Sequence, residues 1–211
     1  MIGVFGGSFS PIHNGHVRLA IAARRQLGLA QVRLVPAASP PLRAAPAIPA
    51  ARRLRWVKLA TAGQRGFVVD DRELARKGPS YTVDTLLELR REHPRAALCL
   101  LLGQDAARQL SRWHRWRSLS RLAHLVFFHR PGRPATLAPA VARHLRGRKA
   151  HSVAQLRSRP AGWWWRCAMP PVPISSTQVR QRLRSNQSVA GLVPAAVVAD
   201  FNKQDLEAFR R

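Results

Sequence analysis

The sequence predicts an α/β protein in which helices flank a parallel β-sheet, and three observations point to this class. The apolar run at residues 2–5 is ended by Gly6-Gly7, and a helical repeat of apolar residues begins near Asn14. Residues 97–102 form the most apolar run of the chain, which is typical of a parallel strand buried on both faces. The polar string Gly103-Gln104-Asp105 follows it, at the edge where open α/β sheets bind ligands.

The remaining elements follow the same alternation. Strands are predicted at residues 31–35, 67–69, 124–129 and 162–168, and helices at residues 50–62, from 80 to about 93, and after 175. A last helix with a tail is predicted over residues 194–211. Residues 37–49 are rich in Pro and Ala and predict a loop, whereas residues 134–160 show only a weak pattern. The chain of 211 residues is long enough for one substantial core, so residues 1–211 are expected to form a single domain.

The formal net charge is +26, from 36 basic and 10 acidic residues, and only four of the basic residues are lysine. A charge this high is a mark of nucleic-acid binding. The many Ala and Pro residues favour a compositional bias toward Arg instead, and no aromatic RNA-recognition motif is present. Nucleic acid is therefore not expected as a partner.

The sequence also indicates the compartment. Met1 leads directly into a predicted strand, so no signal peptide is expected. The longest apolar stretches are too short to span a bilayer, and no membrane association is expected. Cys99 and Cys167 are well separated and are predicted to be buried thiols. A cytoplasmic protein is expected.

The first candidate site is the turn that follows the first strand. A strand, a glycine-rich turn and a helix start together favour a phosphate site, because unpaired N–H groups and the positive end of the helix dipole face the anion. His13 and His16 are three residues apart at that helix start, so both can donate to one phosphate. Zinc ligation is the alternative, but no Cys or carboxylate nearby completes a ligand set. The string is neither a Walker A loop nor a Gly-x-Gly-x-x-Gly loop.

Several other segments contain residues that are suited to binding. In Gly78-Pro79-Ser80-Tyr81-Thr82, Ser80 or Thr82 can cap a helix whose free N–H groups suit a carboxylate. Asp105 can cap the next helix. Trp113-His114-Arg115-Trp116 fits a partly exposed stacking surface. The acidic string Asp70-Asp71-Arg72-Glu73 is interpreted as a turn, since neighbouring strand residues point to opposite faces and cannot both chelate one ion.

A second anion site is predicted near the C-terminus. Ser175 and Gln178 form a capping box, and Val179 and Leu183 share the core face of the helix that follows. Ser hydroxyls, free N–H groups and Arg180 can converge on phosphates there. A well-capped surface helix is the simpler alternative.

Three strings together carry a family resemblance. Residues 6–16 read Gly-Gly-Ser-Phe-Ser-Pro-Ile-His-Asn-Gly-His, residues 79–82 read Pro-Ser-Tyr-Thr, and residues 174–180 read Ile-Ser-Ser-Thr-Gln-Val-Arg. They resemble, in order, the motifs of bacterial nicotinate-mononucleotide adenylyltransferases in the His-x-Gly-His nucleotidyltransferase superfamily. The resemblance implies a Rossmann-like fold with a C-terminal helical ATP segment at about residues 174–211. It also implies adenylyl transfer from ATP to nicotinate mononucleotide, giving nicotinate adenine dinucleotide and pyrophosphate in NAD synthesis.

The resemblance also implies roles for individual residues. Catalysis is expected from His13, His16 and Arg180. ATP binding is expected from Gly6, Gly7, Ser8, Phe9, His13, His16, Gly103, Asp105, Ile174, Ser175, Ser176, Thr177 and Arg180. Mononucleotide binding is expected from Ser39, Arg43, Tyr81, Thr82, Trp113 and Arg130. Mg²⁺ is expected to be bound mainly through the ATP phosphates and water, with no protein metal site.

Two residues depart from the family pattern. Ser10 stands where the family has Asp, and Leu42 stands where it has His. The nearest alternatives are superfamily members that act on nicotinamide mononucleotide, phosphopantetheine or a cytidylyl substrate. A basic nucleic-acid-binding protein is an alternative of another class, and a homo-oligomer is left open.

Overall fold

The computed structural model describes residues 1–42, 45–129, 137–168 and 174–210. Six strands form one sheet in the order β3-β2-β1-β4-β5-β6. The strands are β1 (Ile2–Gly7), β2 (Gln31–Pro36), β3 (Phe67–Val69), β4 (Leu98–Leu102), β5 (His124–His129) and β6 (Trp164–Ala168). The neighbouring pairs β1–β4, β4–β5 and β5–β6 are all parallel. The α/β class and the parallel sheet are confirmed.

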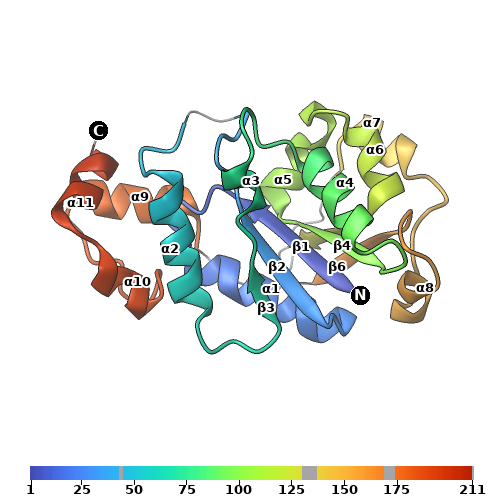
Figure 1. Cartoon of the computed structure of the whole chain (residues 1–211), viewed down its shortest axis with the longest axis horizontal. Coiled ribbons are helices and arrows are strands. Elements are labelled where there is room, and N and C mark those ends of the chain that lie inside the picture. Colours follow the sequence, from blue (N-terminus) through green and yellow to red (C-terminus); the bar gives the residue numbers. More distant parts are fainter. Residues whose placement is uncertain (43–44, 130–136, 169–173, 211) are drawn as a thin grey trace. The chain divides into compact units, whose positions relative to one another are not determined.

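The helices alternate with the strands, and Figure 1 shows their places. They are α1 (Asn14–Leu27), α2 (Ala50–Thr61), α3 (Arg72–Ala75), α4 (Thr82–Glu92), α5 (Gln104–Gln109), the 3₁₀ helix η1 (Leu110–Arg112), α6 (Trp116–Leu122), α7 (Pro139–His144), α8 (Val153–Arg157), α9 (Ser176–Arg184), α10 (Ala195–Asp200) and α11 (Lys203–Arg210). The starts predicted for α1 and α2 are confirmed. The single last helix was wrong, because the backbone at Phe201 is extended and divides α10 from α11.

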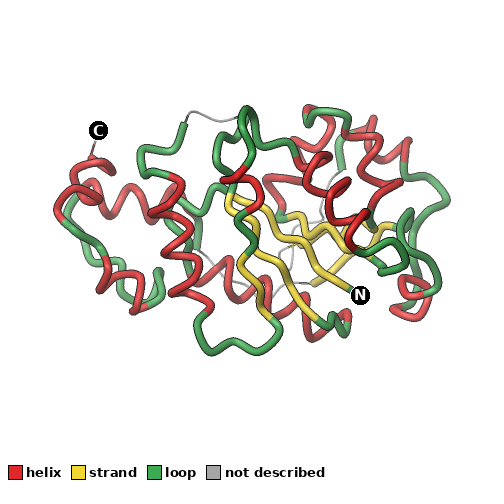
Figure 2. Tube along the Cα trace, viewed as in Figure 1, coloured by secondary structure: helices red, strands yellow, loops and turns green. Residues whose placement is uncertain are grey.

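The chain divides into two compact units. The first unit consists of Met1–Phe5, Ile21–Arg33 and Tyr81–Pro171. All five residues of β4 are buried, as the apolar run predicted. Within this unit α6 packs against β5 and α4, and α5 packs against β4 and β5. Figure 2 shows these helices in red and the strands in yellow.

The second unit consists of Gly6–Ala20, Leu34–Ser80 and Val172–Arg211. Its helix α2 packs against β3 and α10, and α9 packs against α11. The fully buried Trp56 of α2 contacts two rings of the C-terminal segment: its ring centroid is 4.9 Å from that of Phe201 and 6.1 Å from that of Phe209. Aromatic burial therefore anchors the last helices to α2.

The helix caps only partly follow the sequence. Ser175 caps α9, and its hydroxyl accepts a hydrogen bond from the Gln178 amide at 3.1 Å, as predicted. The cap of α4 is Tyr81, not Ser80 or Thr82, and α5 begins after Gly103, so Asp105 lies inside that helix. A capping side chain has to precede the first helical residue, which excludes Thr82 and Asp105.

The acidic string also differs from its prediction. The segment that follows Asp70 forms the short helix α3 and not a simple turn. Asp70 is buried and pairs with Arg72 at 2.8 Å, so its carboxylate is already neutralised by a cation. Within the described ranges no group of three or more His, Cys, Asp or Glu side chains is placed to hold a metal ion.

Candidate nucleotide-binding site

The glycine-rich turn of the second unit holds two stacked imidazoles. His13 immediately precedes α1 and His16 lies in its first turn, and their ring centroids are 3.6 Å apart with 24° between the planes. Phe9 lies edge-on to the ring of His16 at 5.1 Å. Phe9 is buried and has φ of 45°, a backbone conformation that is uncommon for a residue with a bulky side chain and that is often found at functional sites.

Hydrogen bonds fix the orientation of the pair. The amide of His13 donates to Nδ1 of His16 at 3.2 Å, and the amide of His16 donates to the carbonyl of His13 at 2.9 Å. Nδ1 of His16 accepts a hydrogen bond, so the single proton of the neutral imidazole lies on Nε2. In this tautomer the ring N–H of His16 is at Nε2.

Gly15 explains the spacing of the two histidines. A Cβ atom at this position would lie 2.9 Å from Nδ1 of His13, closer than side chains normally approach. The ring of His13 is buried and stacked on His16, so it has little room to move away. Only glycine at position 15 lets both rings occupy this helix start.

The two motifs that the sequence places far apart meet within the second unit. Nε2 of His13 lies 3.1 Å from the hydroxyl of Ser176. Arg180 donates to the carbonyl of Ser10 and to the hydroxyl of Thr177, both at 3.4 Å. The structure thus joins the turn after β1 to the start of α9, as expected for two halves of one phosphate site.

The prediction that free backbone N–H groups at the start of α1 face the anion was partly wrong. The amide of Asn14, at the start of α1, donates to the carbonyl of Leu192 at 2.8 Å, and the side chain of Asn14 donates to the carbonyl of Gly191 at 2.8 Å. The C-terminal loop therefore occupies part of the helix start. The donors suited to an anion are the side chains of His16 and Arg180.

His13 is neutral near physiological pH. Burial, and after it the positive charge of Arg180, together lower the pKa of its imidazole from 6.5 to about 4. Nδ1 of His13 is buried, and no described residue is its hydrogen-bond partner. A negatively charged ligand beside this ring would offset both effects.

Arg53 is a site residue that the sequence reasoning missed. It is 1% exposed, and its guanidinium donates to four carbonyl groups: Ser8 at 2.6 Å, Ala37 at 2.7 Å, Ile48 at 3.0 Å and Ala38 at 3.2 Å. It thus ties the glycine-rich turn to the loop after β2. Its position on the buried face of α2, three and four residues before Trp56 and Val57, was a usable signal.

Ser80 supports the same loop. Its hydroxyl accepts hydrogen bonds from the amides of Ala38 at 3.0 Å and Ser39 at 3.1 Å. This explains why Ser80 does not cap α4. The side chain of Ser39 is exposed. Arg43, predicted to bind the mononucleotide, lies outside the described residues.

The other predicted substrate residues belong to the first unit. The ring of Tyr81 stacks on that of His114, with centroids 4.3 Å apart and 29° between the planes. The sequence predicted His114 only as part of a stacking surface and did not predict its stacking on Tyr81. Trp113 is half-buried. Arg130 lies outside the described residues.

Two further residues of the first unit lie where the sequence placed them. Gly103 follows β4 and caps α5, and Asp105 is exposed in the first turn of that helix. Their position after a buried parallel strand agrees with ligand binding at this edge. Their contact with ATP remains a prediction.

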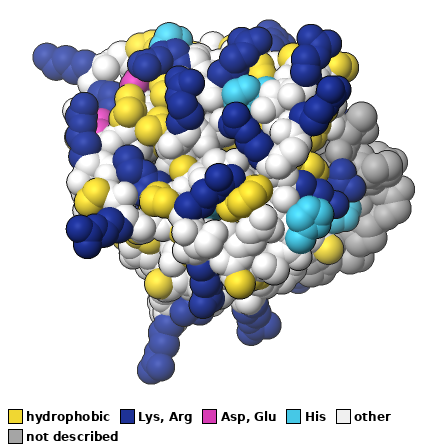
Figure 3. All heavy atoms as spheres, turned by 90° about the vertical axis from the view of Figure 1, so that its right-hand side faces the viewer, with side chains coloured by type: hydrophobic (Ala, Val, Ile, Leu, Met, Phe, Trp, Pro, Cys, Tyr) yellow, Lys and Arg dark blue, Asp and Glu magenta, His cyan; other side chains and the backbone are white. Residues whose placement is uncertain are grey.

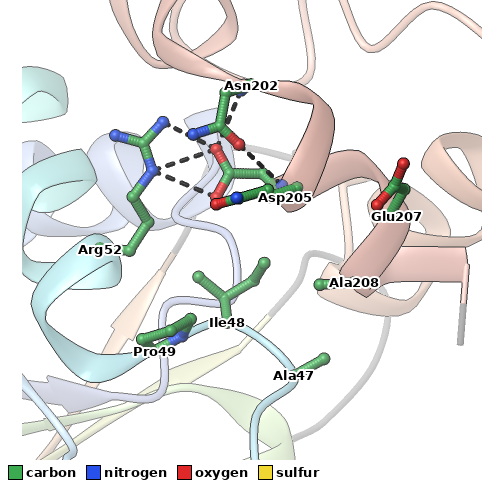
Figure 4. A pocket seen from close by; sticks show the side chains of 9 residues that line it. Ala47, Ile48, Pro49, Arg52, Asn202, Asp205, Glu207 and Ala208 are labelled. Atoms are coloured by element: carbon green, nitrogen blue, oxygen red, sulfur yellow. Dashed lines mark hydrogen bonds and ion pairs between the residues drawn. The ribbon is translucent and has the colours of Figure 1, made fainter.

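A separate pocket of about 520 Å³ lies in the second unit, between the start of α2 and α11 (Figure 4). Its apolar side is formed by Ala47, Ile48 and Pro49. On its polar side Arg52 pairs with Asp205 at 2.7 Å, as the dashed lines of Figure 4 show. The pocket contains none of the residues predicted to bind nucleotides.

This chain is similar to known proteins over most of its length. The profile of the family described as cytidylyltransferase-like matches residues 4–182. A relative from Laribacter hongkongensis, named a probable nicotinate-nucleotide adenylyltransferase, is 50% identical over 197 residues, which cover 92% of this chain and 89% of that protein. A relative of the same name from Aeromonas salmonicida is 45% identical over 207 residues, covering 96% and 94%.

The chain belongs to the nicotinate-nucleotide adenylyltransferase family. The fold agrees with this. The solved structure of Plasmodium falciparum nicotinic acid mononucleotide adenylyltransferase complexed with NaAD has a TM-score of 0.68 at 15% identity and covers 97% of both chains. None of the described helices is long and apolar enough to cross a membrane.

The two departures from the family pattern differ in their surroundings. Ser10 is buried, and its carbonyl accepts a hydrogen bond from Arg180, so the backbone at this position still contacts the second motif. Leu42 is 37% exposed and is the large hydrophobic side chain that stands out to solvent within the described residues. It cannot replace the hydrogen-bonding capacity of a histidine.

Proposed function

We propose that this protein transfers the adenylyl group of ATP to nicotinate mononucleotide, releasing pyrophosphate and forming nicotinate adenine dinucleotide for NAD synthesis. The observation that carries the proposal is the contact between His13 and Ser176, because it unites the two phosphate motifs of the family in one unit. Family membership supplies the reaction class.

The reaction needs positioning and charge stabilisation more than covalent catalysis. An oxygen of the mononucleotide 5′-phosphate attacks the α-phosphorus of ATP, a new P–O bond forms, and the bond to the β-phosphate oxygen breaks. The nucleophile already carries its negative charge, so no protein base is required. Nε2–H of His16 and the guanidinium of Arg180 donate to phosphate oxygens as charge moves to the leaving pyrophosphate.

The main role of His13 is to hold His16 and Ser176 in position. Its ring packs against His16 and contacts Ser176, and it is neutral before the nucleotide binds. The triphosphate raises the pKa of His13 by placing negative charge beside it, so His13 takes up a proton more readily when ATP is bound. The pair then presents more positive charge to the phosphates.

Among the described residues, the donor set offers no cluster of metal ligands. The described residues that surround the two motifs are histidines, serines and arginines, and they lack the clustered carboxylates that hold Mg²⁺. Mg²⁺ is therefore assigned to the phosphates and water, and no step is derived from a protein-bound ion.

The start of α4 suits the nicotinate carboxylate. The amides of Asp84 and Thr85 already bond to the carbonyl of Tyr81, while the amides of Thr82 and Val83 have no partner among the described residues. Such N–H groups can only donate. A carboxylate accepts at both of its oxygens, whereas the amide of nicotinamide mononucleotide brings an NH₂ group that meets donors.

A substrate panel tests this proposal. Pyrophosphate release is measured with ATP and, in turn, nicotinate mononucleotide, nicotinamide mononucleotide and phosphopantetheine. An unmatched buried donor costs about 1–3 kcal/mol, so kcat/KM for the acid should exceed that for the amide by roughly tenfold to a hundredfold. Equal kcat/KM for the two mononucleotides contradicts the carboxylate assignment, and turnover of phosphopantetheine alone contradicts the proposed reaction.

A further inference from the structure

The basic charge of this chain is unevenly distributed along the sequence. Residues 106–199 contain no Asp or Glu, although they contain 17 of the 36 Lys and Arg residues. A compositional bias toward arginine raises the number of cations but does not require the loss of every acidic residue over 94 positions. This asymmetry indicates a surface for a polyanion.

Part of this stretch lies on elements of the first unit that pack together. Six arginines on η1, on α6, and on α7 with the turn after it form what we call the arginine face: Arg112, Arg117, Arg121, Arg143, Arg146 and Arg148. All six are exposed. The helices that carry them pack together, since α6 contacts η1 and α7 contacts η1. Figure 3 shows Lys and Arg side chains spread over the side of the molecule that faces the viewer.

His144 lies among these arginines and connects their helices. Its Nε2 is 3.0 Å from the hydroxyl of Ser120 on α6, and its ring is 5.2 Å from the ring of Trp116. Burial lowers the pKa of His144, and the charges of Arg148, Arg117 and Arg121 lower it further, while a backbone hydrogen bond opposes them. Several cations of the face are thus close enough to repel one more positive charge.

Among the described residues, no carboxylate forms an ion pair with this face. The acidic residues of the first unit are Asp84, Glu88 and Glu92 on α4 and Asp105 on α5. Of the six arginines, none forms an ion pair with a described carboxylate. Like charges gathered without counter-charges are relieved when they bind phosphates and release condensed counterions.

We propose that the arginine face binds single-stranded nucleic acid through its phosphate backbone. Arginine suits this role because its planar fork donates to two phosphate oxygens and also stacks on flat rings. Arg117 already lies 4.6 Å from the ring centroid of Trp116. Contacts of this kind tolerate any base sequence.

Two observations favour this partner over other polyanions. A membrane-binding surface needs apolar side chains to insert, and the exposed large hydrophobic among the described residues is Leu42, which belongs to the other unit. The helices of the face have seven residues in α6 and six in α7, which is short for a helix that reads a duplex major groove.

The experiment compares two variants with the same loss of charge. The face variant combines Arg121→Gln, Arg143→Gln, Arg146→Gln and Arg148→Gln. The control variant combines Lys58→Gln, Arg65→Gln, Arg182→Gln and Lys203→Gln, four exposed cations of the second unit. Fluorescence anisotropy measures binding of a labelled 20-nucleotide oligouridylate over a range of salt concentrations, with ATP present at saturation to occupy the nucleotide site. Circular dichroism and adenylyl transfer confirm that both variants are folded.

The face variant should bind the oligouridylate at least tenfold more weakly than the parent, and the control variant less than about twofold more weakly. The slope of log affinity against log salt should become shallower by about 0.7 for each lost arginine that contacts a phosphate. Equal weakening in both variants shows that net charge alone is responsible and overturns the proposal. Stronger binding to vesicles with half anionic lipid than to the RNA, lost only in the face variant, also overturns it.

Discussion

The phosphate motifs and the predicted pyridine-binding residues are supported in different ways. In the second unit the buried His13 and Arg53 are held by side-chain and backbone hydrogen bonds, and His13 is in contact with a second motif. In the first unit Tyr81 and Trp113 are only half-buried, and Tyr81 is supported by stacking on the exposed His114. Charge stabilisation requires donors fixed before the reaction, whereas a flat ring is bound by faces that tolerate small displacements.

The largest expected effect tests the support of the phosphate motifs. Arg53→Met should lower the free energy of unfolding by on the order of 3 kcal/mol or more, because it leaves several carbonyl groups without their donor. Arg55→Met is the matched control: Arg55 lies on the same helix, but its side chain is 60% exposed, and Asp200, its ion-pair partner, keeps its pairing with Arg52, so the loss of Arg55 should change stability little. Urea denaturation measures both. Equal free energies of unfolding for the two variants would show that the hydrogen bonds of Arg53 do not stabilise the fold.

The second effect concerns pH. Folding lowers the pKa of His13 from 6.5 to about 4, so between these values the unfolded chain binds a proton that the folded chain does not. His13 therefore contributes most to stability above pH 6.5, and this contribution, on the order of 3 kcal/mol, is lost as the pH falls toward 4.

His13→Gln should flatten the fall in stability over this range, measured by urea denaturation at a series of pH values. The exposed His151 gives the control, since His151→Gln should leave the slope as in the parent. The same slope in His13→Gln and in the parent would mean that other groups cause the acid sensitivity. His124 and His144, whose pKa values burial also lowers, remain in both variants.

The third effect compares one histidine from each unit. His16→Ala should reduce kcat on the order of 10²-fold, as for the loss of one oxyanion donor, without changing the fold. His114→Ala should leave kcat unchanged and raise KM for the mononucleotide, because it removes only the support of Tyr81. Steady-state pyrophosphate release separates the two constants. Near-normal kcat in His16→Ala would refute the role of the stacked histidines.

The smallest effect concerns the ring itself. Trp113→Ala should raise KM for nicotinate and nicotinamide mononucleotides by similar factors, roughly fivefold, because stacking contributes about 1 kcal/mol and does not distinguish acid from amide. Both KM values are measured with the same pyrophosphate assay. A change in the ratio of the two KM values would show that Trp113, and not the start of α4, distinguishes the acid from the amide.

Both departures from the family pattern were visible in the sequence, and their consequences differ. At Ser10 the structure retains a backbone contact with Arg180, which does not depend on the side chain. At Leu42 the departure from the family pattern lies in the side chain, which is exposed. A substitution leaves the backbone carbonyl in place, whereas it removes the imidazole of a histidine.

The sequence by itself determined most of the elements. The buried strand Leu98–Leu102 followed from an unbroken apolar run, and the starts of α1 and α9 followed from a glycine-rich turn and from the cap Ser175. These are local effects, since hydrophobic periodicity and capping depend on residues a few positions apart. The order of the motifs likewise identified the family before any contact was known.

Only the tertiary structure decided what those residues touch. Ser80 could have capped α4 by its position, but its hydroxyl serves the amides of Ala38 and Ser39, some forty residues earlier. The helix start at Asn14 could have offered its amide to a phosphate, but Leu192 occupies that amide. Arg53 is one of many arginines in the sequence and becomes a support only where four carbonyl groups meet it. Hydrogen bonds between distant segments satisfy buried polar groups, and their partners are set by the packing of the whole chain.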